Sequence, residues 1–241
     1  MALTRRQIGE NVKRIRANVA VAAARAGRDG GSVQLVAVTK AVGIEQVKAL
    51  IELGVTDLGE NHVQQLMPRV GEVAEWLGRR RKAPAPAVRW HMVGHLQRNK
   101  VRQVLPVVEM IHSVDSLRLA EDIDTRGERA GLVANILLEV NCSGEDQKYG
   151  VAVGAVTHLA EQVCTLRNLR LLGLMTMAPL TSDPEKARPT FVRLREIFED
   201  MISEKIGGKE FRHLSMGMSQ DYQVAVEEGA TIIRVGTAIF E

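Results

Sequence analysis

The sequence predicts an α/β fold of the (β/α)8 type, a TIM barrel with an extra N-terminal helix, from three observations. Short runs rich in β-branched residues alternate with longer amphipathic stretches, as they do in βα units. The 241 residues are enough for one such barrel. Hydrophobic residues make up 45% of the chain but aromatic residues only 3%, so the core has to be aliphatic, which suits parallel strands buried on both faces. We therefore expect a single domain over residues 1–241.

Eight of the short runs are predicted to be strands. They lie at residues 34–39, 55–60, 88–95, 107–114, 135–141, 170–177, 211–216 and 231–237. A helix is expected after every strand except the last, and the extra helix covers residues 4–26. The alternative is a doubly wound open sheet, which is built from the same βα units. Residues 79–87 are expected to be an insertion between the second helix and the third strand.

Three helices have clear sequence signals. After the first predicted strand, four apolar residues share one helical face: Ile44, Val47, Leu50 and Ile51. Asp183 followed by Pro184 predicts a helix start, because aspartate caps the first turn and proline fits its first position. Ser219 is expected to cap a short helix that ends near Gly229.

The balance of charged residues indicates whether the protein binds nucleic acid. Lys and Arg number 32 against 29 Asp and Glu, for a formal net charge of +3. The densest basic run, Arg79 to Lys82, is followed by two prolines and is interpreted as a solvated loop, with a basic docking patch as the alternative. Nucleic-acid-binding proteins usually concentrate positive charge on one face or tract, so we expect no nucleic-acid partner.

The sequence lacks the signals of secreted, membrane and metal-binding proteins. Cys142 and Cys164 have neither metal-ligand spacing nor a disulfide framework around them. Residues 1–20 are polar and amphipathic, unlike a signal peptide, and no apolar run approaches about 18 residues. We therefore predict a cytoplasmic protein without a metal site and without membrane contact.

Polar residues recur where each predicted strand ends. They include Lys40, Asn61, His95, His112, Asn141, Thr176, Ser215 and Arg234. In a (β/α)8 barrel the carboxyl ends of the strands meet at one face, and this face carries the active site. A ring of polar residues there predicts a ligand site.

Arg234 is the most unusual member of this ring. Alternation along the last strand places it on the same face as Ile232, toward the barrel interior. A buried charge needs a partner. The partner is either a carboxylate such as Glu139, in a structural role, or an anionic or aromatic ligand.

The residues beside Arg234 predict a phosphate site. Gly236 lets a ligand approach the backbone, and the amide and hydroxyl of Thr237 can donate to phosphate oxygens. Ser215 ends the preceding strand, and the ends of the last two strands are the recurrent phosphate site of these barrels. The structural alternatives are a plain turn at Gly236 and a strand-end hydroxyl at Ser215.

Lys40 follows the first strand directly and is the best candidate for covalent chemistry. A lysine at this position is expected to be partly desolvated and close to other cations, which lowers its pKa and frees the amine for Schiff-base formation. The alternative is a surface lysine that begins a loop.

Five motifs resemble those of the pyridoxal phosphate homeostasis protein family, also called the proline synthetase co-transcribed family. They are VAVTK at 36–40, GEN at 59–61, WHMVGHLQRNK at 90–100, LSMGMS at 214–219 and RVGT at 234–237. The similarity runs in order over nearly the whole chain, and the third and fourth motifs are highly specific.

The resemblance implies a barrel similar to the N-terminal domain of alanine racemase, with pyridoxal 5′-phosphate (PLP) as the cofactor. It implies that Lys40 holds PLP as a Schiff base and that Arg234 contacts the pyridine nitrogen. The residues implied for the rest of the cofactor site are Ser215, Gly236 and Thr237 at the phosphate, Met218 and Ser219 beside it, and Asn61 near the ring.

The chain departs from the family pattern in two places. His62 and Val63 follow Asn61 where an aromatic residue or an arginine is usual, which affects the outer wall of the site. Members of the family usually continue with a glycine after Phe240, so we expect a short tail to be missing after Glu241.

The first functional hypothesis is a protein that holds PLP reversibly for intracellular PLP homeostasis, without turnover of its own. An arginine beside the pyridine nitrogen keeps the ring neutral and a weak electron sink, which argues against demanding carbanion chemistry. Enzymes that lack their PLP are the expected recipients. We expect a monomer, because the chain has no second domain of the kind that completes an alanine racemase dimer.

The alternative is a PLP-dependent amino-acid racemase, and a third hypothesis is phosphosugar binding without a Schiff base. A racemase needs a second base. His95 is a candidate, although a structural role in its loop is the preferred interpretation. Tyr149 is interpreted as loop packing, with a ligand contact as the alternative. Gln97 to Lys100 are interpreted as a solvated helix start, with a secondary PLP or partner site as the alternative.

Overall fold

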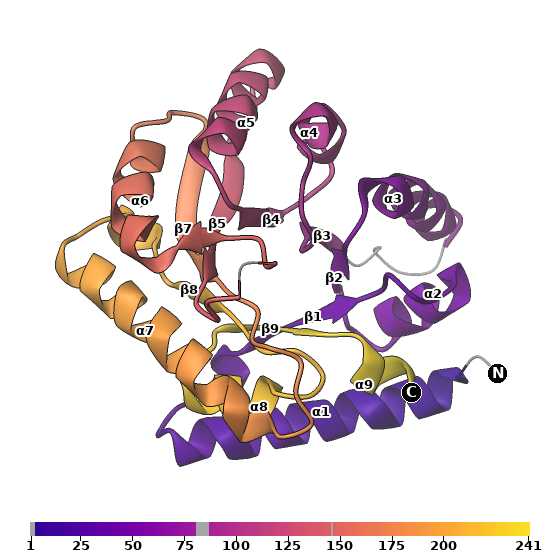
Figure 1. Cartoon of the computed structure of the whole chain (residues 1–241). Helices are drawn as coiled ribbons and strands as arrows, with labels where there is room; N and C mark the ends of the chain where they lie inside the picture. Colours follow the sequence, from indigo (N-terminus) through magenta and orange to yellow (C-terminus); the bar gives the residue numbers. More distant parts are fainter. Residues whose placement is uncertain (1–2, 81–86, 146) are drawn as a thin grey trace.

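Eight parallel strands form a closed barrel in the computed structural model, which describes residues 3–80, 87–145 and 147–241 (Figure 1). The barrel strands are β1 (Gln34–Val38), β2 (Asp57–Glu60), β3 (Arg89–Met92), β4 (Met110–Val114), β5 (Ala134–Asn141), β7 (Leu169–Met175), β8 (His213–Ser215) and β9 (Ile232–Val235). β1 pairs with both β2 and β9, and β4 pairs with β5. This closure confirms the (β/α)8 prediction and excludes the doubly wound open sheet. The short β6 (Val151–Ala152) pairs with the end of β5.

Helices surround the barrel (Figure 1). They are α2 (Ile44–Glu52), α3 (Val63–Gly78), α4 (Val101–Val104), α5 (Leu117–Ala130), α6 (Val156–Cys164), α7 (Arg188–Ser203), α8 (Tyr222–Glu227) and α9 (Thr237–Phe240). The last strand was expected to have no helix after it, and this expectation is wrong, because α9 follows β9 after a single residue. None of the helices in the described ranges has the length and apolar character needed to cross a bilayer.

The predicted extra helix is α1 (Arg5–Arg25), which lies along one side of the barrel against α8 and α9 (Figure 1). It begins at a capping box, in which Thr4 and Gln7 exchange side-chain and backbone hydrogen bonds. Asn11 donates to the backbone oxygen of Ile239, and Asn18 donates to the hydroxyl of Tyr222. The first of these bonds holds α9 against α1, and the second holds α8.

The predicted helix starts have different outcomes. The Asp183 carboxylate accepts from the amide of Glu185 at the start of a 3₁₀ turn that leads into α7, as predicted. Ser219 does not cap α8. This helix begins at Tyr222, and the residue at its N-cap is Asp221, two residues after Ser219. Most of the predicted insertion at 79–87, including Arg81 and Lys82 of the basic run, lies outside the described residues.

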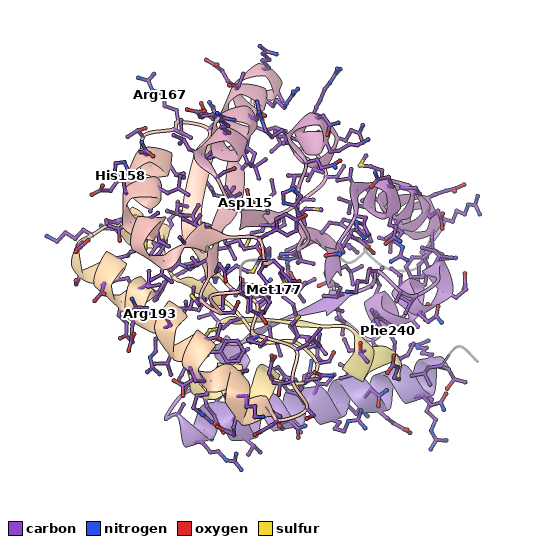
Figure 2. The ribbon with its side chains drawn as sticks, viewed as in Figure 1. Asp115, His158, Arg167, Met177, Arg193 and Phe240 are labelled. Carbon is purple, nitrogen blue, oxygen red and sulfur yellow. The ribbon has the colours of Figure 1, made fainter. Side chains whose placement is uncertain are left out.

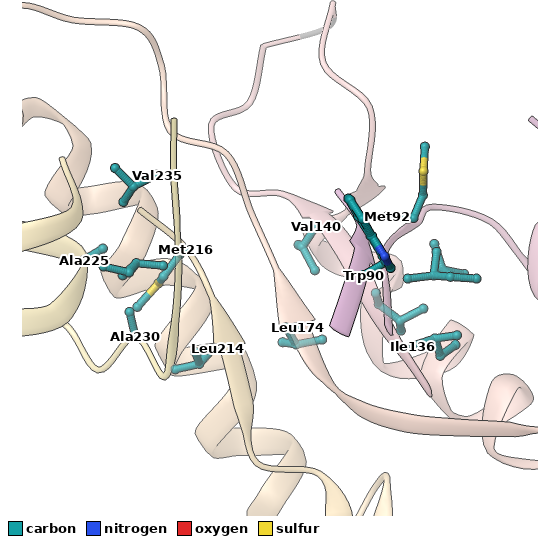
Figure 3. Close-up of a cluster of buried hydrophobic side chains, with 14 of the residues drawn as sticks. Trp90, Met92, Ile136, Val140, Leu174, Leu214, Met216, Ala225, Ala230 and Val235 are labelled. Carbon is teal, nitrogen blue, oxygen red and sulfur yellow. The ribbon is translucent and has the colours of Figure 1, made fainter. Parts of the chain in front are cut away.

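The core has two layers, separated by the wall of the barrel. The larger layer lies between the strands and the helices, and Figure 3 shows a part of it, with Trp90, Leu174 and Val235 among the labelled side chains. The smaller layer fills the barrel interior with Val36, Val93, Met110, Leu137, Met175 and Ile232. Ile232 lies inside while Ile233 and Val235 lie outside, so the predicted alternation along β9 is confirmed. Arg234 therefore faces the interior, directly above the apolar layer.

Candidate functional site at the carboxyl ends of the strands

The loops that leave the carboxyl ends of the strands gather at one mouth of the barrel. Figure 2 shows Asp115, which follows β4, and Met177, which follows β7, near the centre of the ring of helices. All eight residues that the sequence analysis assigned to a cofactor site lie at this mouth, on loops, in the last residues of strands or, for Thr237, at the first position of α9. They are Lys40, Asn61, Ser215, Met218, Ser219, Arg234, Gly236 and Thr237.

Lys40 is exposed, contrary to the expectation that it is partly desolvated. The reason is that β1 ends at Val38 and the last buried residue is Thr39, so Lys40 already belongs to the turn that follows. The amine is therefore open to solvent and to a ligand, and its backbone is set by its neighbours.

Arg69 of α3, which the sequence analysis missed, holds the backbone on both sides of Lys40. Its guanidinium donates to the backbone oxygens of Thr39 and Val42 and pairs with the fully buried Glu60. The Thr39 hydroxyl also donates to Glu60. The loop that carries Lys40 is thus fixed at both ends, although the side chain of Lys40 has no partner in the part of the chain that the structure describes.

Asn61 follows β2 and packs against the backbone of Gly94 after β3. A Cβ atom on Gly94 would lie 2.2 Å from the side-chain oxygen of Asn61 and 2.3 Å from its backbone oxygen. Only glycine leaves room for this contact. Gly94 is held in turn by the Ser113 hydroxyl, which donates to its backbone oxygen at 2.6 Å.

Arg234 is buried and hydrogen-bonded on its Nη atoms. Nη1 donates to the Ser215 hydroxyl at 2.7 Å, and Nη2 donates to the backbone oxygen of Thr176 at 2.9 Å. Burial lowers the pKa of Arg234 to about 10, against the opposing charges of Glu139 and Asp221, and this value still leaves it a cation at neutral pH.

Glu139 does not pair with Arg234, so the structural partner considered for this arginine is not found. Within the described ranges no ion pair joins Arg234 to any carboxylate, and its direct partners are a hydroxyl and a backbone oxygen. Glu139 is itself buried on β5, and burial raises its pKa to about 7, although the charge of Arg234 acts in the other direction. It is a carboxyl group that gains or loses a proton near neutral pH.

Two backbone amides and a hydroxyl meet at the start of α9. The Ser219 hydroxyl accepts from the amide of Gly236 at 3.3 Å and from that of Ala238 at 3.1 Å. Thr237 is exposed beside them, and Met218 is half-buried in the preceding loop, where its amide donates to Asp221 at 2.6 Å. The hydroxyl that lies at Gly236 is therefore that of Ser219, whereas Ser215 lies deeper, under Arg234.

Ser215 is connected to two histidines, of which the sequence analysis placed His112 in the ring of strand-end polar residues without giving it a role and did not single out His91. Its hydroxyl lies 2.9 Å from His112 Nδ1, and His112 Nε2 lies 3.0 Å from His91 Nδ1. Both rings are fully buried. Alternation along β3 and β4 places these histidines on the interior face, but their mutual contact depends on the stagger of the strands.

At the rim of the mouth, His95 contacts two loops. Its Nδ1 lies 3.2 Å from a carboxylate oxygen of Asp115, and its ring stacks on Tyr149 with 4.2 Å between centroids and 14° between planes. Tyr149 is 56% exposed. The contacts connect the loops after β3, β4 and β5. They agree with a structural role for His95 and with loop packing for Tyr149, the interpretations preferred from the sequence. Of Gln97 to Lys100, the first three residues are exposed, and Arg98 pairs with Asp122.

Comparisons with known proteins identify the family. The family model described as alanine racemase, N-terminal domain, matches residues 11–241. A pyridoxal phosphate homeostasis protein of Aquifex aeolicus is 36% identical over 231 residues, which cover 96% of either chain. One of Pseudomonas aeruginosa is 36% identical over 233 residues, covering 97% of this chain and 94% of the relative.

Solved structures agree with this result. A protein of Bifidobacterium adolescentis described as unknown has a TM-score of 0.90 at 39% identity, covering 98% of this chain and 95% of the other. PipY of Synechococcus elongatus, solved with PLP bound, has a TM-score of 0.82 at 29% identity, covering 97% and 100%. An alanine racemase of Clostridium difficile shares the fold, with a TM-score of 0.70 at 12% identity over 56% of its length. The chain therefore belongs to the pyridoxal phosphate homeostasis protein family.

Proposed function

We propose that this protein binds PLP at the carboxyl mouth of the barrel, holds it as a Schiff base on Lys40 and serves PLP homeostasis. The observation that carries the proposal is the convergence at one mouth of three different groups. These are the exposed amine of Lys40 in the turn after β1, a buried arginine on β9 and a cluster of amides and hydroxyls at the start of α9. An amine, a ring-nitrogen donor and a phosphate site are the groups that PLP requires.

The phosphate end of the site fits an anion. The amides of Gly236 and Ala238 already point at one oxygen atom, that of Ser219, and the exposed hydroxyl of Thr237 adds a donor. A Cβ atom on Gly236 would lie 3.1 Å from the backbone oxygen of Val38, so this glycine keeps the ends of β1 and β9 close together. In our proposal Ser219, Gly236 and Thr237 bind the phosphate, and Ser215 acts on Arg234.

The ring end of the site fits a neutral pyridine. Arg234 stays protonated at neutral pH and has only donors to offer, so it favours a ring nitrogen that accepts a hydrogen bond. When bound, PLP supplies an aldehyde that reacts reversibly with amines, and an unprotonated ring withdraws electrons weakly. We therefore prefer a protein that holds PLP without turnover. In this proposal the protein is monomeric and cytoplasmic, and enzymes that lack PLP are the recipients.

An amino-acid racemase is the second candidate, and one observation favours it. His95 at the rim has its Nδ1 3.2 Å from a carboxylate oxygen of Asp115, and a carboxylate neighbour can orient an imidazole for proton transfer. Its ring face, however, is covered by Tyr149. We therefore propose the holding function first and make racemisation an outcome of the same experiment.

Absorption spectra of the protein reconstituted with PLP test the proposal. Wild type, Lys40→Ala and the control Lys48→Ala, whose lysine pairs with Glu45 on α2, are compared before and after borohydride reduction. We expect a yellow band and a PLP-modified peptide in wild type and Lys48→Ala, and neither in Lys40→Ala. Incubation with single-enantiomer amino acids should give no racemisation. Steady racemisation would favour the enzyme, and no band in wild type would remove the proposal and leave a phosphate-binding barrel.

A further inference from the structure

Five side chains from five strands form a continuous series of hydrogen bonds through the barrel, here called the interior polar chain: Asp57, His91, His112, Ser215 and Arg234. The successive contacts are 3.1 Å, 3.0 Å, 2.9 Å and 2.7 Å long. β4 and β8 are not neighbours in the sheet, so the contact between His112 and Ser215 crosses the barrel interior (Figure 1).

The interior polar chain is shielded from water. His91, His112 and Ser215 have no exposed surface, and Arg234 and Asp57 are 4% and 8% exposed. Buried polar groups need a hydrogen-bond partner for each donor, because an unpaired one costs about 1–3 kcal/mol. The positions of the protons can therefore be derived from the contacts.

The charges at the two ends of the interior polar chain follow from the groups around them. Burial alone would raise the pKa of Asp57, but hydrogen bonds from His91, Arg89 and Gln34 outweigh it and lower this pKa below its ordinary value. Asp57 is thus a carboxylate and only accepts hydrogen bonds. Arg234 is a cation and only donates them.

The histidines between these ends fit one arrangement of protons. Asp57 accepts, so His91 Nε2 carries a proton, and a neutral His91 then accepts at Nδ1 from His112 Nε2. Burial above all, with the nearby charge of Arg234, holds the pKa of His112 well below its ordinary value, so this ring is neutral and accepts at Nδ1 from the Ser215 hydroxyl. The Ser215 oxygen then accepts from Arg234. Every donor points from Arg234 toward Asp57.

The reverse arrangement leaves a donor unpaired. If His91 were charged, it would donate to His112 Nε2, and His112 would donate to Ser215 from Nδ1. Ser215 would then receive two hydrogen bonds, and the described residues offer no other acceptor for its own hydroxyl proton. The cost of that unpaired buried donor favours the first arrangement.

The far end of the interior polar chain is held at the opposite mouth of the barrel. Asp57 accepts from Arg89 Nε at 2.7 Å and from Gln34 at 2.8 Å. Asp57 and Gln34 also line a cavity of about 370 Å³ between α1 and the starts of β1 and β2. Asp57 determines the direction of all the hydrogen bonds in the interior polar chain. It is held by Arg89 and Gln34, which lie far from the proposed cofactor site.

We propose that the interior polar chain positions Arg234 for its ligand. With Ser215 committed to His112 as a donor, its oxygen accepts only from Nη1, which fixes the guanidinium and leaves Nε without a protein partner among the described residues. His112 and His91 are positioning residues, because they act on the ligand through Ser215 and Arg234. The identity of the ligand as PLP rests on the proposed function, whereas the orientation of the chain does not.

The first experiment uses ligand-free protein and is independent of PLP. Two-dimensional ¹⁵N NMR of the histidine rings, assigned with His91→Phe and His112→Phe, reports which nitrogen carries the proton. We expect both rings to be neutral with the proton on Nε2, and we expect the Arg234 Nε signal to shift in His112→Phe. A proton on Nδ1 of either ring, or an Arg234 signal that does not move, would overturn the inference.

The second experiment measures the consequence for bound PLP. In His112→Phe we expect roughly tenfold weaker retention of PLP, from the loss of one buried hydrogen bond near a charged group, and a shifted absorption band, with PLP still trapped on Lys40. His112→Gln, whose amide can accept from Ser215 and donate to His91, should restore most of both.

The matched control is Leu137→Ala, which opens a space in the interior apolar layer and removes no hydrogen-bonding group of the interior polar chain. It should lower thermal stability and leave the absorption band in place. A His112→Phe protein with the retention and band of wild type would overturn the positioning role. If wild type itself fails to bind PLP, the proposed function fails, and the NMR experiment alone decides the inference.

Discussion

Glu60 and Glu139 are both buried carboxylates of the barrel, but of the two only Glu60 forms an ion pair among the described residues. Glu60 on β2 pairs with Arg69 and accepts from the Thr39 hydroxyl. Glu139 on β5 lies where burial raises its pKa to about 7, and no ion pair reaches it within the described ranges. Glu60, which is paired with Arg69, holds the groups around it in place, whereas Glu139 has no such pair and has a pKa near neutral pH. The comparison indicates that one arginine accounts for the difference.

The two carboxylates lie beside different parts of the proposed site, Glu60 beside the loop of Lys40 and Glu139 near Arg234. Glu60 and Arg69 fix the backbone around an otherwise free Lys40. Glu139 faces Arg234, which is held by Ser215 and Thr176 instead of by a carboxylate. An exposed amine on the strand end next to the proposed ring and phosphate site suits a protein that holds its ligand reversibly.

Removing Arg69 should make Glu60 resemble Glu139, with the largest effect that we predict. Arg69→Leu leaves a carboxylate with no exposed surface without its cation, and breaking such a pair typically lowers the free energy of unfolding by about 3 kcal/mol or more. Denaturant unfolding at pH 7.5 measures the loss.

The control for this substitution is Arg79→Leu at the C-cap of the same helix, where the exposed pair with Glu75 contributes little to stability. Adding Glu60→Gln to Arg69→Leu should recover part of the loss, because it removes the unpaired charge. A loss below about 1 kcal/mol in Arg69→Leu would contradict the importance of the pair.

Neutralising Glu139 should have a smaller effect that depends on pH. The ordinary pKa of 4.5 applies to the unfolded chain and a pKa of about 7 to the folded protein. Between these values the folded state binds a proton that the unfolded state has released, so Glu139 makes the protein less stable as the pH rises through this window. Glu139→Gln should therefore stabilise the protein at pH 8, by at most about 3 kcal/mol, and have little effect at pH 4.5.

Unfolding of wild type and Glu139→Gln across pH 4.5 to 8.5 tests this expectation. A difference in unfolding free energy that stays constant over the whole range would show that the carboxyl does not titrate in this window. Loss of PLP retention in Glu139→Gln at pH 8 alone would instead connect the carboxylate form to the ligand.

Local signals in the sequence predicted the parts of the fold that depend on short-range rules. Alternation identified the interior face of β9 and so the burial of Arg234, and the Asp183–Pro184 pair identified the start of the segment that leads into α7. The positions of the strand ends identified the mouth, because closing a barrel brings these ends together regardless of the loops.

Contacts between distant residues were not predictable in the same way. Arg69 lies nine residues after Glu60 on another element. Nothing in this spacing shows that its side chain reaches the backbone of Thr39 and Val42 in the loop after β1. Ser219 has the sequence context of a helix cap, but the amides of Gly236 and Ala238 use its hydroxyl. His91 and His112 alternate correctly, yet their contact depends on the relative stagger of β3 and β4.

Thr39→Val should have the smallest effect of the three and shows whether Arg69 alone is sufficient for Glu60. Valine keeps the shape of threonine and removes the hydroxyl that donates to Glu60. With Arg69 still in place, the loss of one hydrogen bond should lower the free energy of unfolding by about 1–1.5 kcal/mol. Thr190→Val, at a buried position on α7, is the matched control.

The double variant Thr39→Val with Arg69→Leu decides how the two contacts cooperate. Both groups act on the same carboxylate, so we expect the combined loss of unfolding free energy to differ from the sum of the single losses by at least about 0.5 kcal/mol. Strict additivity would mean that the hydroxyl and the guanidinium act on Glu60 independently. The loop of Lys40 would then depend on the backbone contacts of Arg69 with Thr39 and Val42, and not on the neutralised charge of Glu60.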